Sequence, residues 1–182
     1  MIREDIFETP IWKGPLKLNN KLLIKLLEVC EVTNYMGSAS SVDGSTQTNN
    51  LLKFKAFSYT KLCIENYFQQ ETNHQVTMKN AWICRNPPNS RNKLHVHDCH
   101  ISGVYYIQTH KDSGNLIFRN PNEVVQVASG NLYQKDKCFW HEYTIAVEEN
   151  MIVFFPNWVP HESARNQSKN HRLALAFNLM YY

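Results

Sequence analysis

The stretch HRLALAFNL, residues 171–179, alternates between two kinds of side chain. Positions 173, 175 and 177 are Leu, Leu and Phe, whereas the alternate positions 172, 174 and 176 are Arg, Ala and Ala. This period of two predicts a β-strand whose apolar face packs against helices. Its other face suits a barrel lumen with room for an anionic ligand, because a buried guanidinium is costly without an anion. The alternative is a solvent-facing arginine on an edge strand.

Two helices are predicted before residue 72. Asn19 and Asn20 precede KLLIKLLEVCEV and suit the N-cap of a first helix. The stretch 51–70 contains neither Gly nor Pro and predicts a second helix. Apolar residues recur at helical spacing, namely Leu23, Leu26, Leu27 and Cys30 in the first helix and Leu52, Ala56, Tyr59, Cys63 and Tyr67 in the second.

After residue 72 the chain breaks into short segments rich in β-branched and aromatic residues. Many short strands with frequent turn signals predict a sandwich or barrel. The predicted strands are 75–84, 101–108, 116–119, 123–128, 139–147, 151–155, 162–165 and 172–180. We therefore expect a mainly β, α+β fold in one domain spanning 1–182, with a helical flank at 1–72 and a β core at 73–182.

Composition excludes several classes of protein. The chain has 182 residues, 43% of them hydrophobic, and a net charge of +3, which is ordinary for a globular protein. No cluster of Lys and Arg indicates nucleic-acid binding, and no apolar stretch predicts a membrane span. MIREDIFETP at the start is acidic and does not resemble a secretory signal. Five dispersed cysteines indicate reduced thiols in a cytoplasmic protein. The sequence does not determine the oligomeric state, and a homodimer is one possible state.

Histidines indicate a metal site. In LHVHDCH, residues 94–100, His95 and His97 would point to the same face of a strand and reach one metal ion. By itself, such a pair is as typical of surface histidines at the end of a strand as it is of a metal site. A third residue, His161, follows an apolar strand in FFPNWVPHESARN, residues 154–166. Together with Arg172 on the next predicted strand, these histidines form an ordered set that predicts a metal site beside a carboxylate clamp.

The order of motifs resembles that of the non-haem Fe(II)- and 2-oxoglutarate-dependent oxygenases, and in particular the small members from bacteria and marine phages. The resemblance covers nearly the whole chain. The matching residues are Phe7-Glu8-Thr9-Pro10, Trp82, His95, His97, Ser102-Gly103-Val104-Tyr105-Tyr106, Ser113-Gly114-Asn115-Leu116-Ile117-Phe118, Asn120-Pro121, Phe155-Pro156, His161, Asn166, Arg172 and Phe177-Asn178.

This resemblance implies a double-stranded β-helix, or jelly roll, with Fe(II) as metal and 2-oxoglutarate as cosubstrate. It implies that His95 and His161 bind iron and that Arg172 binds the distal carboxylate of 2-oxoglutarate. Tyr106 and Ser102, in the SGVYY motif, would line the cosubstrate pocket. The implied reaction is hydroxylation of a small molecule or side chain with release of succinate and CO2, and the substrate itself stays open.

The third metal ligand departs from the usual pattern. A carboxylate two residues after the first histidine is usual, but His97 stands there and Asp98 follows. Three ligand sets stay open: His95/His97/His161, His95/Asp98/His161 and His97/Asp98/His161. We favour the first, which would also suit Zn(II). His100 is a weaker candidate.

Two other functions stay open. A cupin-type dioxygenase with three histidines would not use 2-oxoglutarate, and Pro156-x-Trp158-x-x-His161 resembles the second cupin motif. Arg172 favours the 2-oxoglutarate-dependent enzyme over this rival. A non-catalytic jelly-roll module would bind a sugar or a structural partner. In either enzyme, the loops 37–50 and 85–93 are expected to rim the pocket.

Overall fold

The structure, a computed structural model, describes residues 8–33, 40–122 and 140–182. The predicted strand at 123–128 and the first residue of the one at 139–147 lie outside them. The helices are α1 (Asn20–Thr33) and α2 (Ser58–Thr72), preceded in the second case by the 3-10 turns η1 (Leu51–Lys53) and η2 (Lys55–Phe57). The strands are β1 (Trp12–Pro15), β2 (Ser41–Val42), β3 (Thr46–Gln47), β4 (Val76–Asn86), β5 (Arg91–Asn92), β6 (Ile101–Gln108), β7 (Leu116–Arg119), β8 (Glu142–Ile145), β9 (Met151–Pro156), β10 (His161–Ser163) and β11 (Arg172–Tyr181).

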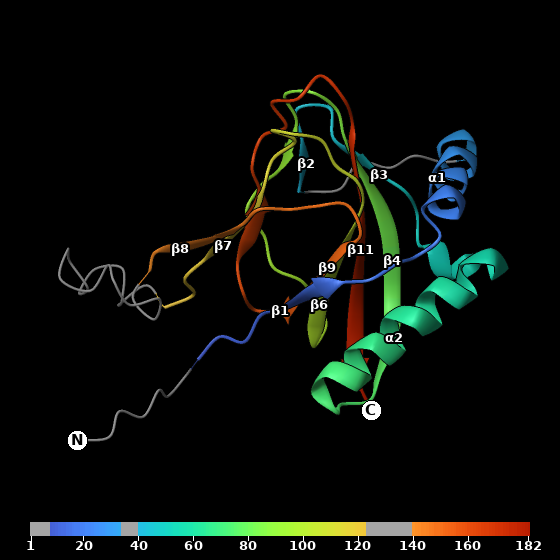
Figure 1. Cartoon of the computed structure of the whole chain (residues 1–182), viewed down its shortest axis with the longest axis vertical. Coiled ribbons are helices and arrows are strands. Elements are labelled where there is room, and N and C mark those ends of the chain that lie inside the picture. Colours follow the sequence, from blue (N-terminus) through green and yellow to red (C-terminus); the bar gives the residue numbers. More distant parts are fainter. Residues whose placement is uncertain (1–7, 34–39, 123–139) are drawn as a thin grey trace.

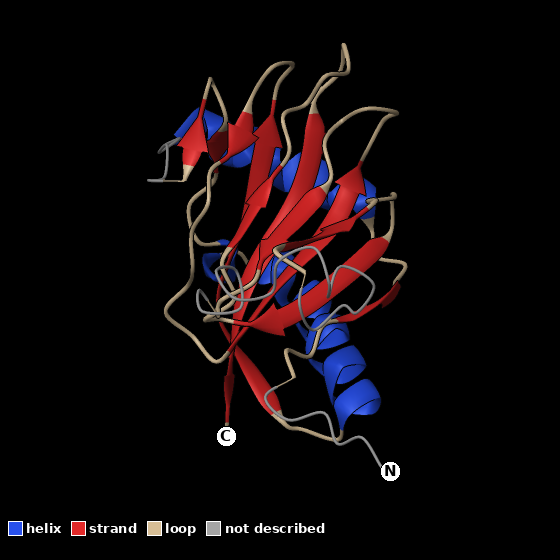
Figure 2. Ribbon diagram, turned by 90° about the vertical axis from the view of Figure 1, so that its left-hand side faces the viewer, coloured by secondary structure: helices blue, strands red, loops and turns tan. Residues whose placement is uncertain are grey.

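The strands form a major and a minor sheet. The major sheet has the order β1-β9-β6-β11-β4-β3, the minor sheet has the order β10-β7-β8, and β2 pairs with β5. Strand β11 lies between β6 and β4 and pairs antiparallel with both. Both helices cover one face of the major sheet, and the minor sheet lies on the other side (Figures 1 and 2). The predicted jelly roll flanked by N-terminal helices is therefore confirmed.

The two faces of the major sheet belong to different cores. Leu175 and Phe177 of β11 pack with Leu23 of α1 and Ile64 of α2 in the helix-side core. The minor sheet packs on the opposite face in a second core of buried residues: Tyr106, Leu116, Phe118, Ile145, Val153, Phe155, Val159 and Ala174. The strict alternation of β11 thus places its large apolar side chains under the helices, as predicted.

Gly103 of β6 allows this close packing. A Cβ atom at this position would lie 2.2 Å from the ring of Phe177 on the neighbouring strand. Such a distance is far shorter than van der Waals contact, so any side chain at 103 would displace the aromatic ring. The glycine of the SGVYY motif therefore has a packing role in the helix-side core.

Helix α1 begins as its sequence predicts. The Asn19 side-chain oxygen accepts a hydrogen bond from the Leu22 N–H at 3.0 Å, as expected of an N-cap residue. The predicted apolar positions of this helix are buried, namely Leu23, Leu26, Leu27 and Cys30.

The single helix predicted for 51–70 is wrong in its start and in its buried face. Phe54 has extended backbone angles between η1 and η2, and α2 begins only at Ser58. The Asn50 side chain accepts from the Leu52 N–H and also from the Ala81 N–H of β4, which ties this turn to the sheet. The break shifts the buried face by one residue. The buried residues of α2 are Thr60, Ile64 and Phe68, whereas Tyr59 is 74% exposed.

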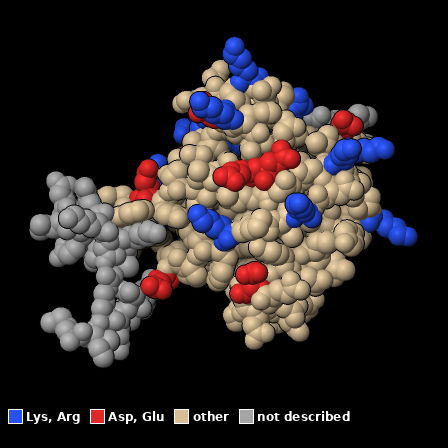
Figure 3. Space-filling view, viewed as in Figure 1, with Lys and Arg blue, Asp and Glu red and all other residues tan. Residues whose placement is uncertain are grey.

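Charged side chains are scattered over the described surface. On the face shown in Figure 3, Lys and Arg side chains alternate with Asp and Glu side chains. Several charged side chains of the described residues form ion pairs, such as Lys61 with Glu65 and Arg165 with Asp43. None of the described helices is both long enough and apolar enough to cross a membrane.

Candidate metal centre

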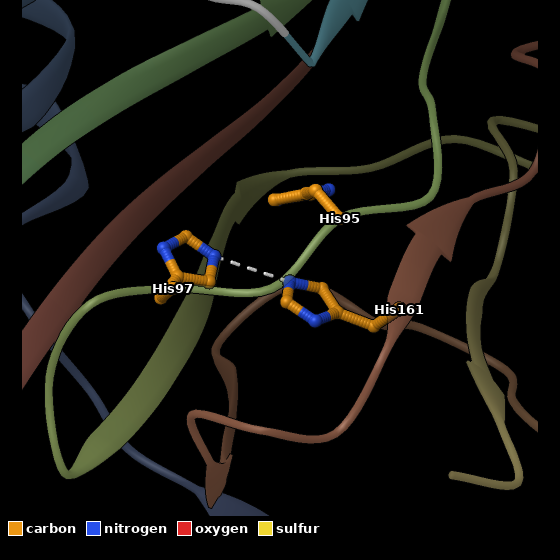
Figure 4. A group of neighbouring side chains, drawn as sticks. All are labelled: His95, His97 and His161. Atoms are coloured by element: carbon orange, nitrogen blue, oxygen red, sulfur yellow. Dashed lines mark hydrogen bonds between the residues drawn. The ribbon is translucent and has the colours of Figure 1, made fainter.

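His95, His97 and His161 converge although the HVH stretch is not the regular strand that was predicted. His95 forms an isolated antiparallel bridge with His161, the first residue of β10, through two backbone hydrogen bonds of 3.0 Å. The His97 N–H donates to the Asn157 carbonyl at 3.2 Å, which holds the following residues alongside the same segment. The chain is therefore extended enough for positions i and i+2 to point the same way. Figure 4 shows the three rings facing one another.

Backbone carbonyls orient two of the three imidazoles. Nδ1 of His95 lies 2.7 Å from the Lys93 carbonyl oxygen, and Nδ1 of His161 lies 3.0 Å from the Val159 carbonyl oxygen. Because a carbonyl only accepts hydrogen bonds, each Nδ1 carries the proton and each Nε2 keeps its lone pair. This carbonyl-histidine arrangement is typical of metal sites.

The distances between the rings fit one metal ion. Nε2 of His97 lies 3.2 Å from Nε2 of His161, a contact drawn in Figure 4. One nitrogen from each of the three histidines lies within 4.8 Å of the others. Metal–imidazole bonds are about 2.1 Å long, so two neighbouring ligands on one ion would lie about 3 Å apart. The donor set therefore fits Fe(II) or another first-row metal.

Burial keeps these imidazoles neutral. Desolvation, followed by the effect of neighbouring His95, lowers the pKa of His161 to about 3. Desolvation and then His95 also lower the pKa of His97 to about 4, and desolvation lowers that of His95. At neutral pH all three rings therefore offer lone pairs without first losing a proton.

Asp98 and His100 lie apart from this group. The Asp98 side chain is fully exposed and pairs with Lys79 Nζ at 3.0 Å. His100 Nδ1 accepts from the Tyr181 N–H at 2.9 Å, and its ring stacks on the Tyr181 ring. The structure thus assembles the favoured ligand set and gives His100 a role at the end of β11. Both ligand sets that contain Asp98 would require this carboxylate to leave Lys79 and turn inward.

Arg172 is buried in the same pocket as the three histidines. Its side chain is 2% exposed and lines the pocket with Ala174 and Ala176, as the alternation of β11 predicts. Nη1 donates to the carbonyl oxygens of Ser113 and Gly114 at 3.1 and 2.7 Å. Nη2 donates to Asn86 Oδ1 at 3.0 Å, and the buried Nε has no partner. In the described part of the chain no carboxylate pairs with this cation.

Arg172 keeps its charge in this environment. Burial lowers the pKa of its guanidinium, against the opposing effects of Tyr106 and Cys84, but a guanidinium stays protonated in proteins. A buried cation without an anion is unfavourable unless a ligand supplies one. The unpaired Nε therefore fits the carboxylate of a ligand.

Two predicted cosubstrate residues have different positions. Tyr106 lines the pocket, and burial raises the pKa of its hydroxyl, which therefore remains protonated. Ser102 is not among the pocket-lining residues. Its hydroxyl lies 3.4 Å from Asn178 Oδ1 and 3.3 Å from Cys99 Sγ. Ser102 shares its strand face with Tyr106 but lies four residues before it, near the start of β6, and the structure does not bring it into the pocket.

Other side chains complete the pocket. Trp82, a matched motif residue, packs against His97 with ring centroids 5.7 Å apart. The two stretches expected to rim the pocket contribute Ser40, Asn86 and Asn92 to its lining. Gly114 has a φ of +92°, and a Cβ there would lie 2.3 Å from the Ala164 carbonyl oxygen and 2.9 Å from Arg172 Nη1. Glycine at this motif position therefore lets its carbonyl approach the arginine.

Asn86 lies in the stretch 85–93 that is expected to rim the pocket, but its contact with Arg172 is not predicted from the sequence. Asn86 ends β4 directly opposite Arg172 in the strand register and holds its guanidinium. Asparagine at this position carries no signal in the sequence, because it lies beside two prolines where a turn residue is expected. Only the pairing of β4 with β11 reveals the contact.

Solved structures with the same fold come from several organisms. HygX from Streptomyces hygroscopicus with nickel and 2-oxoglutarate bound has a TM-score of 0.67 and 12% identity, over 94% of this chain and 83% of HygX. A Pseudomonas putida prolyl-4-hydroxylase has a TM-score of 0.62 and 14% identity, over 94% of this chain and 92% of the hydroxylase. A Trichoplax adhaerens prolyl hydroxylase in complex with a hypoxia inducible factor peptide fragment has a TM-score of 0.64 and 13% identity. The match covers 96% of this chain and 83% of that hydroxylase.

The sequence itself identifies the family. No curated protein matches this sequence. The model of the family described as "Putative 2OG-Fe(II) oxygenase" matches residues 80–178, which is more than half of the chain. The matched region contains all three clustered histidines and Arg172. The chain therefore belongs to the 2-oxoglutarate- and Fe(II)-dependent oxygenase family.

Proposed function

We propose that this chain hydroxylates a small molecule or an exposed side chain, with Fe(II) held by His95, His97 and His161 and 2-oxoglutarate held through Arg172. Bound together, ferrous iron and 2-oxoglutarate allow O2 to oxidise a C–H bond while the cosubstrate is converted to succinate and CO2. The observation that carries this proposal is the convergence of three neutral imidazoles and one buried, carboxylate-free guanidinium in a single pocket. The nickel and 2-oxoglutarate bound to HygX, which has this fold, support it.

The histidines would bind the metal without rearrangement. His95 and His161 are already held in the required tautomer by backbone carbonyls, and the His97 ring packs against Trp82. Such preorganisation lowers the cost of binding, because few side-chain rotamers remain to be fixed. Because the ligands are neutral, the site attracts the ion less strongly than a set with a carboxylate. The set is also less selective against Zn(II).

Arg172 would bind the carboxylate of 2-oxoglutarate that lies away from the metal. Its Nε and Nη2 lie on one edge of the planar guanidinium and can form a forked pair with two carboxylate oxygens. The protonated Tyr106 hydroxyl borders the same space and can donate to the ligand. These two residues would orient the cosubstrate.

Apolar side chains would keep water away from the reacting groups. The lining of the pocket that holds the histidines and Arg172 includes Val104, Leu116, Phe155, Ala174 and Ala176. In such surroundings an ion pair between Arg172 and a ligand is stronger than it is in water. A dry pocket also protects the oxidising species from side reactions.

The decisive experiment is an anaerobic titration with Fe(II), with and without 2-oxoglutarate, followed by visible absorption. We expect a weak charge-transfer band that requires both components. His161→Ala should abolish the band, whereas His100→Ala, which removes an imidazole outside the cluster, should keep it. Iron binding without the band would favour a three-histidine dioxygenase that does not use 2-oxoglutarate. Absence of metal binding would favour a non-catalytic module.

We also propose that the protein acts in the cytoplasm. Among the described cysteines, Cys63, Cys84 and Cys99 are thiols and do not form disulfides. Reduced thiols are typical of the cytoplasm. Formation of a disulfide in protein isolated under non-reducing conditions would argue against this location.

A further inference from the structure

Three of the five donors of Arg172 are already used, and all three acceptors are neutral. Nη1 donates to two backbone carbonyls, those of Ser113 and Gly114, and Nη2 donates to the Asn86 side-chain oxygen. The Nε–H and one N–H of Nη2 remain available. Nε and Nη2 are neighbours on one edge of the guanidinium. The arginine is therefore held firmly in place while one edge stays available.

Asn86 is itself oriented by its surroundings. It is 1% exposed, and its Nδ2 donates to Ser45 Oγ at 2.7 Å and to Asn92 Oδ1 at 2.9 Å. With both amide hydrogens used, Oδ1 is left to face Arg172, so the network determines which way the amide points. Ser45 Oγ in turn donates to the Arg91 carbonyl, and the Asn92 N–H donates to Ser163 Oγ.

The neutrality of Asn86 matters as much as its geometry. A carboxylate at this position would form a buried ion pair with Arg172, and such pairs are strong and short. The cation would then be neutralised inside the protein and its attraction for a ligand carboxylate would fall. An amide oxygen accepts the same hydrogen bond without cancelling the charge.

We propose that Asn86 is a positioning residue for 2-oxoglutarate binding: it orients Arg172 through a neutral acceptor and thereby reserves the full charge and the Nε/Nη2 edge for the distal carboxylate. This inference rests on the proposed function. It assigns Asn86 no contact with the cosubstrate, since the amide acts through the guanidinium. The network of Ser45 and Asn92 sets the orientation of Asn86 in the same way.

The test is calorimetric titration of 2-oxoglutarate into the anaerobic Fe(II)-loaded protein. We expect Asn86→Asp, which has the same size, to weaken 2-oxoglutarate binding at least tenfold and to leave the affinity for Fe(II) within twofold of the wild type. Asn86→Ala removes the acceptor without adding charge and should weaken binding about threefold. Asn73→Asp, the same change at an exposed residue directly after α2, should leave the affinity unchanged.

The outcomes separate this inference from the proposed function. If the wild type binds 2-oxoglutarate and Asn86→Asp binds it equally well, the inference is wrong and the proposed function stands. A parallel loss of Fe(II) and 2-oxoglutarate affinity in Asn86→Asp would indicate general damage to the pocket and would also overturn it. If Asn86→Asp does not fold, unchanged affinity in Asn86→Ala contradicts the inference. Absence of 2-oxoglutarate binding by the wild type would contradict the proposed function itself.

Discussion

The two faces of β11 differ in what fills the space beside them. On the helix side, Leu175 and Phe177 are at most 1% exposed and belong to the same buried core as residues of both helices and of neighbouring strands. On the opposite side, Arg172 and Ala176 line a pocket between the major and minor sheets. One strand therefore supplies dense packing on one face and an open binding site on the other.

This difference separates stability from function along a single segment. Large apolar side chains contribute stability in proportion to the area they bury, whereas alanines on the other face leave volume for a ligand. The buried Arg172 adds little to stability, since it lacks an anionic partner among the described residues. Substitutions on the two faces should consequently affect different measurements.

The largest effect on stability is expected from Phe177→Ala. Phe177 is 1% exposed, and its ring lies 5.6 Å from the ring of Phe154 in an edge-on contact. Its removal leaves a cavity, so the free energy of unfolding should fall by about 3–5 kcal/mol in a denaturant titration. Tyr182→Ala, which removes an exposed aromatic ring near the same strand, should change it by less than about 0.5 kcal/mol. A loss below about 1 kcal/mol for Phe177→Ala would contradict the packing described.

The opposite face is tested by Arg172→Ala. The variant should bind 2-oxoglutarate about 30-fold more weakly or worse, because truncation of one partner of a buried charge pair costs about 2–5 kcal/mol. Calorimetry on the Fe(II)-loaded protein measures this. Arg165→Ala removes an exposed arginine that pairs with Asp43 and serves as control. Unchanged 2-oxoglutarate affinity in Arg172→Ala would disprove the assignment of Arg172.

Sequence reasoning could predict β11 because its alternation is local. Every second side chain of a strand points the same way, so the alternation by itself predicts that Arg172 and the alanines share one face, whatever strands pair with β11. Helix α2 shows the opposite case. Which of its residues are buried depends on two hydrogen bonds that the Asn50 side chain accepts from the Leu52 and Ala81 N–H groups. Ala81 belongs to a strand about thirty residues away in the sequence. A local pattern does not contain that information.

The residues of the site also differ in whether local sequence is enough to predict them. His95, His97 and His161 could be grouped because two are neighbours in sequence and the third follows a recognisable apolar strand. Asn86 could not be assigned, because its role exists only where β4 meets β11 and where segments bearing Ser45 and Asn92 meet it. The SGVYY motif predicts Ser102 in the pocket, yet this face of β6 extends beyond the pocket lining. Sequence spacing does not show where a pocket ends.

A matched pair of substitutions measures the space on each face. Ala81 of β4 is fully buried in the helix-side core, whereas Ala176 of β11 lines the pocket. Ala81→Leu should destabilise the protein by about 1–3 kcal/mol, because extra methylenes in a packed core force side chains and backbone to move. Ala176→Leu should cost less than about 0.5 kcal/mol, because the added atoms extend into the pocket. Equal losses in the two variants, measured by denaturant titration, would show that the faces are equally packed.

The smallest effect concerns Cys84, on the pocket face of β4. Burial raises the pKa of its thiol to about 11, and the positive charge of Arg172 together with a hydrogen bond from Trp82 opposes this rise. Only the thiolate reacts with iodoacetamide, and below the pKa its fraction increases about tenfold for each pH unit. The alkylation rate at Cys84, followed by mass spectrometry, should therefore still be rising between pH 9 and pH 10.

Unfolded protein supplies the reference for this measurement. Its cysteines have a pKa of about 8.5, so their rates should level off within that pH interval. Arg172→Ala removes a positive charge that favours the thiolate, and the pKa of Cys84 should rise further, so its alkylation at any given pH becomes slower. A plateau near pH 9 in the native protein would mean that water solvates this thiol well. The helix-side core and the pocket would then differ only in packing density. The pocket would not have the low polarity that strengthens an ion pair between Arg172 and a ligand.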